Sequence, residues 1–292
     1  SGGQNDENVR KRGRRIEMEK QYTELNIAKE RRKYIAGLVI AVAAVNGFIA
    51  LVMGSEVNFV YFDVVRIGTI ASAVVMSFVI LARQGSAGLF GRAYTALAVG
   101  LTMWLVAESS WGYYEVVLGE ESPFPSIADA FWLGAYGGLL YYVFSLYKFF
   151  GRGIKKYAIV GVIAAIAIFS YFYMQSLISV LVPPEGDGGD EFILPLGITV
   201  AYPVLDFILF IPAILIVFNS GKGQLTSVPW IFVSFILTAV ADILLGYAIL
   251  GGFENDVTIV TMIYNSAYLC MAAGLLWYLR FFISGQRQVL KS

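Results

Sequence analysis

The chain has 292 residues, of which 58% are hydrophobic and 14% charged, and its 21 basic residues balance its 21 acidic ones. A soluble domain of this size is excluded, because too little polar surface remains to cover it. The chain has no histidine and one cysteine, Cys270, which excludes a disulfide framework, a thiolate metal cluster, a His-ligated haem or zinc site and a His-based catalytic triad. We therefore expect no cofactor, no metal ligand and no catalytic residue.

The first 33 residues form a charged segment that precedes the apolar part of the chain. From Arg10 to Lys33 it contains no proline and is dense in good helix formers. Its basic residues favour a cytoplasmic juxtamembrane helix held to anionic lipid headgroups. The alternative is a helix that docks a cytoplasmic partner or relays a signal.

Eight apolar segments follow, each long enough to cross a hydrocarbon core of ~30 Å, which takes ~20 helical residues. The sequence therefore predicts an all-α integral membrane protein with eight transmembrane helices. We divide the chain into the cytoplasmic helix (1–33), a first four-span repeat (34–151), a second (152–284) and a cytoplasmic tail (285–292). The spans are expected at 34–54, 63–83, 93–116, 127–149, 156–182, 195–219, 228–251 and 257–283.

Charge is sorted between the two sides of these spans. Twenty of the 21 basic residues fall in the N-terminal segment, in alternate loops with their helix ends, or in the tail, and only Arg66 falls elsewhere. Fifteen of the 21 acids lie in the opposite loops or in the helix halves that face them. Because basic loops remain cytoplasmic, we expect a multi-pass protein of the cell membrane with both termini in the cytoplasm.

Two short patterns recur in the second half of the chain. Ala-Glu-(three residues)-Gly-Tyr at 107–113 recurs as Ala-Asp-(three residues)-Gly-Tyr at 241–247, and Gly-Leu-Leu-Tyr-Tyr at 138–142 recurs as Gly-Leu-Leu-Trp-Tyr at 274–278. The offsets of 134 and 136 indicate two parallel four-helix repeats related by an axis along the membrane normal. Chance similarity between apolar helices is the alternative.

Polar residues inside the spans are the candidate ligand-binding residues, because a charged group in hydrocarbon costs ~2.5–3.5 kcal/mol and usually faces the bundle interior or water. We predict one outward-opening polar cavity lined by spans two, three, four, six, seven and eight. Arg66 is the expected counter-ion of Asp206 or Glu108. The repeat aligns Glu108 with Asp242, Asp129 with Asn265, and Trp132 with Tyr268. The candidate set is Arg66, Glu108, Trp111, Asp129, Trp132, Tyr136, Asp206, Asp242, Asn265 and Tyr268.

Each of these assignments has a structural alternative. Asp129 follows Pro125-Ser126, so it is also suited to be the acid in the first turn of a helix. Asp206 and Asp242 are also suited to join helices as protonated hydrogen-bond donors.

Two stretches resemble a known class of membrane regions. These are Pro125-Ser-Ile-Ala-Asp-Ala-Phe-Trp-Leu-Gly-Ala-Tyr136 and Tyr202-Pro-Val-Leu-Asp206. They are similar to the multi-span N-terminal sensor regions that precede diguanylate cyclase, phosphodiesterase or histidine kinase modules in bacterial signalling proteins. The resemblance implies a membrane-embedded input module with no catalytic residue, in which Asp129 and Asp206 are the motif acids. Because Ser292 follows the last span closely, output is expected through the N-terminal helix, a partner or a further part of the protein.

The sequence thus favours a sensor or receptor-like module that binds a small ligand or cation from the outer side. A cation-coupled transporter or ion-translocating protein is the first alternative, and a non-catalytic accessory subunit of a membrane complex is the second. Intramembrane aspartyl proteolysis by Asp206 and Asp242 is disfavoured, because the flanking residues match neither motif of presenilin-like proteases. The expected partners are the lipid bilayer, the ligand and a cytoplasmic protein at the N-terminal helix, with no nucleic acid.

Overall fold

The computed structural model describes residues 29–30, 32–51, 58–119, 123–151, 153–181, 190–219, 228–249 and 257–283. Within these ranges every regular element is a helix. The chain divides into two compact units, Ser1–Ala44 and Val45–Ser292. The predicted cytoplasmic helix at 1–33 and the tail at 285–292 lie almost entirely outside the described residues.

The first unit contributes the beginning of one apolar helix, Arg32–Leu51. At the start of this helix, Lys33 forms an ion pair of 3.1 Å with Glu30, three residues earlier. Both side chains are exposed to solvent, so this ion pair is hydrated and adds little to the stability of the fold.

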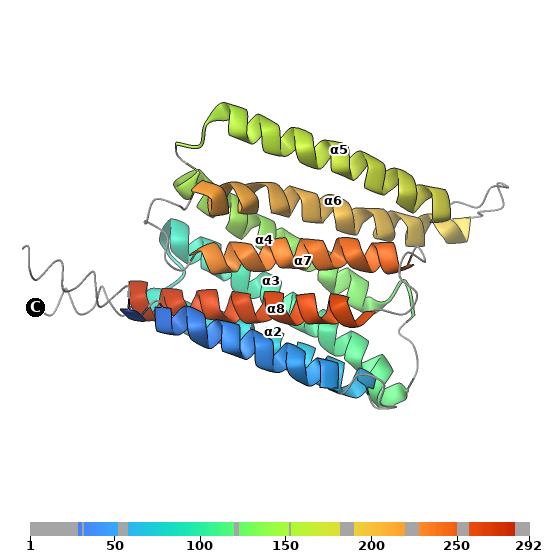
Figure 1. The fold of residues 1–292 in the computed structure, drawn as a ribbon, viewed down its shortest axis with the longest axis horizontal. Helices are drawn as coiled ribbons and strands as arrows, with labels where there is room; N and C mark the ends of the chain where they lie inside the picture. Colours follow the sequence, from blue (N-terminus) through green and yellow to red (C-terminus); the bar gives the residue numbers. More distant parts are fainter. Residues whose placement is uncertain are drawn as a thin grey trace, which may run out of the picture. The chain divides into compact units, whose positions relative to one another are not determined.

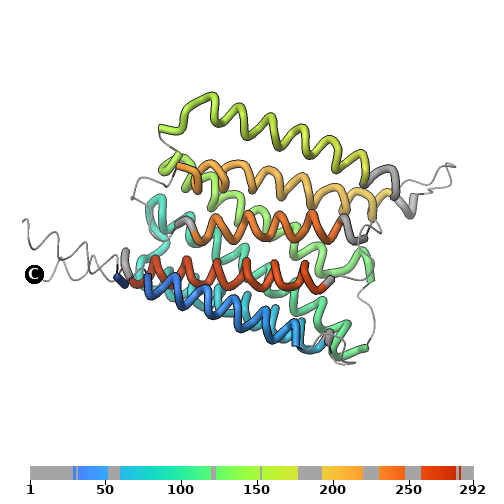
Figure 2. Tube along the Cα trace, in the orientation of Figure 1, coloured from blue at the N-terminus to red at the C-terminus, as the bar shows by residue number. Residues whose placement is uncertain are grey.

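The second unit is a helical bundle (Figures 1 and 2). The π-helical turn η1 continues α3, and η3 continues α8. The elements are α2 (Asn58–Gln84), α3 (Gly88–Gly112), η1 (Tyr113–Leu118), α4 (Ile127–Phe150), α5 (Lys156–Leu181), α6 (Asp190–Asn219), α7 (Val228–Ile249), α8 (Val257–Trp277) and η3 (Tyr278–Ile283). Long apolar segments become helices because only a helix satisfies every backbone N–H and C=O within one segment, where hydrocarbon offers no partners.

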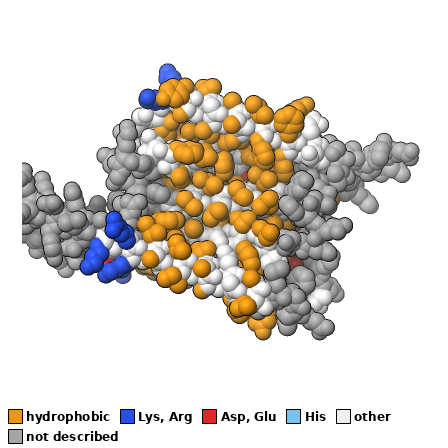
Figure 3. Space-filling view, viewed as in Figure 1, with side chains coloured by type: hydrophobic (Ala, Val, Ile, Leu, Met, Phe, Trp, Pro, Cys, Tyr) orange, Lys and Arg blue, Asp and Glu red, His pale blue; other side chains and the backbone are white. Residues whose placement is uncertain are grey.

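Seven helices of the described residues are long and apolar enough to cross a membrane. In α7 the apolar stretch found by the same measure, Trp230–Gly246, is shorter. Large hydrophobic side chains point outward along the helices, and hydrophobic atoms cover the middle of the face shown in Figure 3. The length, composition and apolar exterior support the assignment of a multi-pass membrane protein.

Neighbouring helices in the second unit form two closely packed pairs, α3 with α4 and α7 with α8. Helix α2 packs against α3 and α8, and α6 packs against α7 and α4. Helix α5 makes extensive contacts with α6 only, and it lies beside α6 at the edge of the bundle (Figure 1). Six helices therefore enclose the interior in which the polar residues lie.

Glycines set the close approach within each pair. A Cβ atom at Gly138 of α4 would lie 2.4 Å from the carbonyl oxygen of Ala96 in α3. A Cβ atom at Gly274 of α8 would lie 2.9 Å from the backbone nitrogen of Ile231 in α7. Small residues of this kind let helix backbones touch, which is the main packing gain available inside a bilayer.

The bundle has two ends of different chemistry, named here by a residue at each. At the Tyr94 end, where α3 and α7 begin, Tyr94 stacks on Tyr278 with ring centroids 4.5 Å apart, and Tyr142 stacks on Phe232 at 6.2 Å. At the Asp129 end, where α2, α4, α6 and α8 begin, acids and an arginine enter the interior. The half at the Asp129 end therefore holds the candidate site.

Candidate functional site

Arg66 of α2 is the centre of a first group, the arginine cluster, which consists of Asp63, Arg66, Glu108 and Glu115. Its Nε atom lies 2.7 Å from Oε2 of Glu108 on α3, and its Nη2 atom donates to Oδ1 of Asp63. The side chains of Asp63 and Glu108 are only 2% and 4% exposed. Asp63 precedes Arg66 by three residues, which places both on the same helix face. The guanidinium therefore balances two buried acids, one from its own helix and one from the next.

The second carboxylate oxygen of Glu108 is also satisfied. Oε1 accepts a hydrogen bond of 2.6 Å from the hydroxyl of Tyr268 on α8 and one of 3.1 Å from Nε1 of Trp104, one helical turn away on α3. Trp104 Nε1 lies 2.7 Å from the same hydroxyl. A buried carboxylate is tolerated when a counter-ion and donors occupy its oxygens, and Glu108 has both. The contact joins α2, α3 and α8.

Glu115 extends the arginine cluster toward the Asp129 end. It lies in η1, where its Oε1 atom accepts a hydrogen bond of 2.7 Å from Nε1 of Trp111, and its side chain lies close to that of Asp63. The Trp111 ring packs against Trp132 of α4, with centroids 5.7 Å apart. Trp132 thereby contacts the tryptophan that donates to Glu115.

Asp206 of α6 and Asp242 of α7 form a second group, the acid pair. Their carboxyl groups lie within hydrogen-bonding reach of each other. Asp206 accepts a hydrogen bond of 2.5 Å from Tyr136 of α4, and Asp242 accepts one from Tyr264 of α8. Asp206 is fully buried. The Oδ2 atoms of both acids are buried and have no donor among the described residues.

Aromatic rings connect the arginine cluster to the acid pair. Trp104 packs on Tyr136 with centroids 5.8 Å apart, and Tyr264 packs on Tyr268 at 6.3 Å. Glu108 is also close enough to Asp242 for the two acids to interact electrostatically. Of the two counter-ions foreseen for Arg66, the structure pairs it with Glu108, while the contacts of Asp206 are with Tyr136 and Asp242.

Asp129 and Asn265 lie in contacts that join neighbouring helices. Asp129 completes a capping box at the start of α4, accepting a hydrogen bond of 2.7 Å from the backbone N–H of Ser126. Its other oxygen accepts 2.8 Å from the hydroxyl of Tyr202 on α6. Asn265 of α8 is fully buried and accepts 3.2 Å from the hydroxyl of Thr69 on α2. For Asp129 these contacts agree with the helix-terminal alternative.

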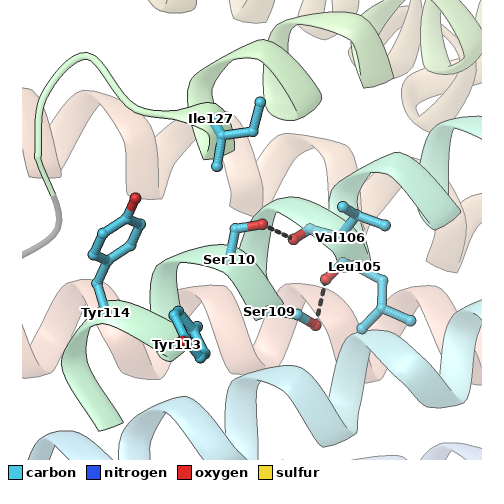
Figure 4. Close-up of a pocket in the computed structure, with 7 residues that line it drawn as sticks. All are labelled: Leu105, Val106, Ser109, Ser110, Tyr113, Tyr114 and Ile127. Carbon is cyan, nitrogen blue, oxygen red and sulfur yellow. Dashed lines mark hydrogen bonds between the residues drawn. The ribbon is translucent and has the colours of Figure 1, made fainter. Parts of the chain in front are cut away.

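An open pocket of about 490 Å³ is lined by other residues (Figure 4). It lies along the last turns of α3, η1 and the first residue of α4. Ser109 and Ser110 point into it, but their hydroxyls donate to the carbonyls of Leu105 and Val106 at 2.7 and 2.8 Å. Its lining residues are Leu105, Val106, Ser109, Ser110, Tyr113, Tyr114 and Ile127. None of the ten candidate residues lines it, so it is not the polar cavity predicted from the sequence.

Sequence reasoning missed four residues of the site: Asp63, Thr69, Trp104 and Tyr264. Two of them carried a local signal, since Asp63 lies three residues from Arg66 and Trp104 four residues from Glu108. Thr69 and Tyr264 contact residues of distant helices, which helical spacing alone does not reveal. Within the described residues, no three acids or cysteines are arranged to hold a metal ion.

Comparison with known proteins adds no family to this picture. No family model matches the chain, and no curated protein or solved structure shows significant similarity to it. The functional argument therefore rests on the residues of this chain and on their contacts.

Proposed function

We propose that the protein is a membrane-embedded sensor module in which the arginine cluster and the acid pair respond to a small ligand or cation from the outer side. The observation that carries this proposal is the surplus of buried acid. Asp63, Glu108 and Glu115 share the guanidinium of Arg66, while Asp206 and Asp242 have no cation against them among the described residues. Uncompensated carboxylates are strongly disfavoured in a bilayer, so an added positive charge stabilises this arrangement.

Occupancy of such a site has structural consequences because the residues belong to six helices. Arg66 and Glu108 join α2 to α3, Tyr268 adds α8, the acid pair joins α6 to α7, and Tyr136 adds α4. Binding or loss of one positive charge changes the forces between these helices. A change at the Asp129 end is then transmitted along rigid helices to the Tyr94 end, where a cytoplasmic partner can detect it.

The orientation and the internal duplication belong to the same proposal. The Asp129 end faces outward, with both termini inside, because basic residues collect at the other end. Helix contacts support the duplication: α2–α3–α4 and α6–α7–α8 pack in the same order, while α4 meets α6 and α8 meets α2. The close-contact glycines, Gly138 and Gly274, are 136 residues apart, which is the offset of the sequence repeat.

A transporter is less well supported than a sensor. Translocation requires polar groups along a path to both sides of the membrane. The half at the Tyr94 end has an interior of packed apolar and aromatic side chains, including Leu97, Ile216, Phe232 and Leu275, each almost fully buried. The accessory-subunit alternative is favoured by one feature, the internal satisfaction of Glu108 and Asp129 by neighbouring donors.

The proximity of Asp206 and Asp242 raises aspartyl proteolysis again, because such enzymes act through two neighbouring aspartates. Hydrolysis needs a water molecule and a peptide between the carboxyls. Asp206 is fully buried, and Tyr136 and Tyr264 already donate to the two acids. This closed arrangement favours a sensing role over a hydrolytic one.

The experiment reconstitutes the full chain in vesicles with a fluorophore on a cysteine introduced at Lys155, in a Cys270→Ser background. Sodium, potassium, magnesium and choline chlorides are added outside at constant ionic strength and pH, and tracer uptake is measured in parallel. A sensor gives a saturable fluorescence change without uptake. Glu108→Gln weakens that change, whereas Ser110→Ala, in the open pocket, does not. Uptake of any cation would establish a transporter. A fluorescence signal that is unchanged with all four salts and on a change of outside pH would reject the sensor and support the accessory subunit.

A further inference from the structure

The geometry of the acid pair is suited to one proton shared between the two carboxyl groups. Each carboxyl uses one oxygen to accept a phenol hydroxyl, from Tyr136 or Tyr264. The remaining oxygens, Oδ2 of Asp206 and Oδ2 of Asp242, are buried without a donor in the described part of the chain, although the two carboxyls are within hydrogen-bonding reach. Two carboxylates would repel each other there, whereas a carboxylic acid and a carboxylate make a hydrogen bond.

The surroundings of the pair offer donors and negative charge, and among the described residues we find no cation against it. Tyrosines face it from the packed helices: Tyr136 from α4, Tyr173 from α5, Tyr202 from α6 itself and Tyr264 from α8. Glu108 of α3 adds a carboxylate on the side of Asp242. Arg66 is bound to Asp63 and Glu108 instead. Within the described part of the chain no positive charge compensates the pair, so a positive charge from the solution would stabilise it.

The chemistry of the site selects the kind of positive charge. Magnesium and calcium take six or more oxygen ligands. Here two carboxyls face each other, and no third acid in the described residues completes a metal site. A proton needs only the two facing oxygens. Coupled carboxyls of this kind hold one proton as a pair, because two adjacent buried carboxylates disfavour full ionisation.

A polar route leads from the Asp129 end to the pair. Glu115 lies in η1 at that end, close to Asp63, and Asp63 contacts Arg66. Arg66 contacts Glu108, which is bonded to Tyr268. The ring of Tyr268 packs on Tyr264, whose hydroxyl bonds Asp242. Hydrogen-bonding groups thus extend from the end of α3 to the middle of α6 and α7.

We propose that Asp206 and Asp242 form a proton-binding site, and that the proton is the ligand of the sensor. The sensing role of this proton rests on the proposed function. The proton-binding site itself rests only on the contacts of the two aspartates. A proton from the outer solution forms an O–H bond at one Oδ2 atom and is shared with the other, and no other bond changes. Its release returns it to the same solution and leaves two carboxylates that push α6 and α7 apart.

Infrared spectroscopy of the full chain in nanodiscs tests the binding site, because a protonated carboxyl has a C=O stretching band that a carboxylate lacks. The wild type should show such a band from the acid pair, slow to shift in D₂O, which disappears as the pH is raised. Asp206→Asn and Asp242→Asn should each abolish it. Asp129→Asn is the matched control, since Asp129 also accepts a tyrosine hydroxyl but its other oxygen accepts from the backbone N–H of Ser126. That variant should retain the band.

Tyr136→Phe is a milder variant that keeps the proposal testable if the asparagine variants fail to fold. It keeps both acids and removes one donor, so the band should remain but move in frequency. A wild type without a titrating carboxyl band would overturn the proposal. So would persistence of the band in both asparagine variants, or a band whose loss follows sodium concentration at fixed pH.

The fluorophore at Lys155 separates this proposal from the proposed function. A titrating band without any fluorescence response to outside pH supports the proton site and rejects the sensor. A fluorescence response to choline or sodium without such a band supports a sensor and rejects the proton as its ligand. Loss of both the band and the pH response in Asp206→Asn supports both proposals.

Discussion

Replacement of Arg66 by methionine is the sharpest test of the arginine cluster. Methionine keeps much of the apolar length of the side chain and removes the guanidinium. Asp63 and Glu108, with side chains 2% and 4% exposed, then lose their counter-ion together. Removal of one partner from a buried ion pair costs about 3–5 kcal/mol, because the other charge is left without compensation. That is a large part of the free energy of unfolding of an ordinary single domain, which is about 5–15 kcal/mol.

The matched control is Arg92→Met, at the other end of the bundle. Arg92 is exposed, and its Nε atom donates to the carbonyl of Gly88 over 3.4 Å. An exposed substitution of this kind changes the free energy of unfolding by about 0.5 kcal/mol or less. The comparison removes the general effect of losing one arginine from the chain.

A double-mutant cycle identifies the cause of the loss. Glu108→Gln makes one of the two orphaned acids neutral, so Arg66→Met should cost less in that background. We expect a coupling of about 1–3 kcal/mol between the two positions, which is typical of residues in direct contact. Unfolding would be followed by circular dichroism while sodium dodecyl sulfate is titrated into mixed micelles. An Arg66→Met variant as stable as Arg92→Met, or strictly additive free energies in the cycle, would refute the reasoning.

Three further predictions follow from the packing and the proposed topology. Gly138→Ala should destabilise the fold by about 1–3 kcal/mol, because the added Cβ atom would collide with the backbone of α3. Gly137→Ala, with open space around its Cβ atom, should be neutral or stabilising by up to about 1 kcal/mol. Equal unfolding curves for the two variants would contradict this. Tyr268→Phe should cost about 1–3 kcal/mol because a buried carboxylate loses a donor, and a cost close to zero would show that water replaces the hydroxyl. In intact cells an impermeant thiol reagent should label a cysteine at Phe124 but not one at Lys155, and labelling of both from outside would reject the orientation.

The helices could be predicted from the sequence because their cause is local. An apolar segment of sufficient length must satisfy its own backbone in a bilayer, whatever lies beside it. The expected segments 127–149 and 156–182 correspond to Ile127–Phe150 and Lys156–Leu181. Helix α6 starts earlier than expected, at Asp190 instead of 195, because a helix can continue past the apolar stretch and Pro195 is accommodated within it.

The polar residues could be identified from the sequence, but their partners could not. Ionisable groups in apolar segments are rare and usually face the interior, which was enough to single out Glu108, Asp206 and Asp242. The choice between Glu108 and Asp206 as partner of Arg66 depends on which helices are neighbours. That choice follows from the contact of α2 with α3, and no spacing within one helix contains it.

The sequence by itself determined which segments are helical and apolar, and which of their residues carry charge, because both properties depend on neighbours along the chain. The tertiary structure decided that Asp63 and Glu108 share one guanidinium, that Tyr136 and Tyr264 each serve one aspartate, and that the two aspartates face each other. These pairings join residues up to 70 positions apart. Their register depends on how closely helix surfaces approach, which small residues such as Gly138 and Gly274 determine only once the helices are packed.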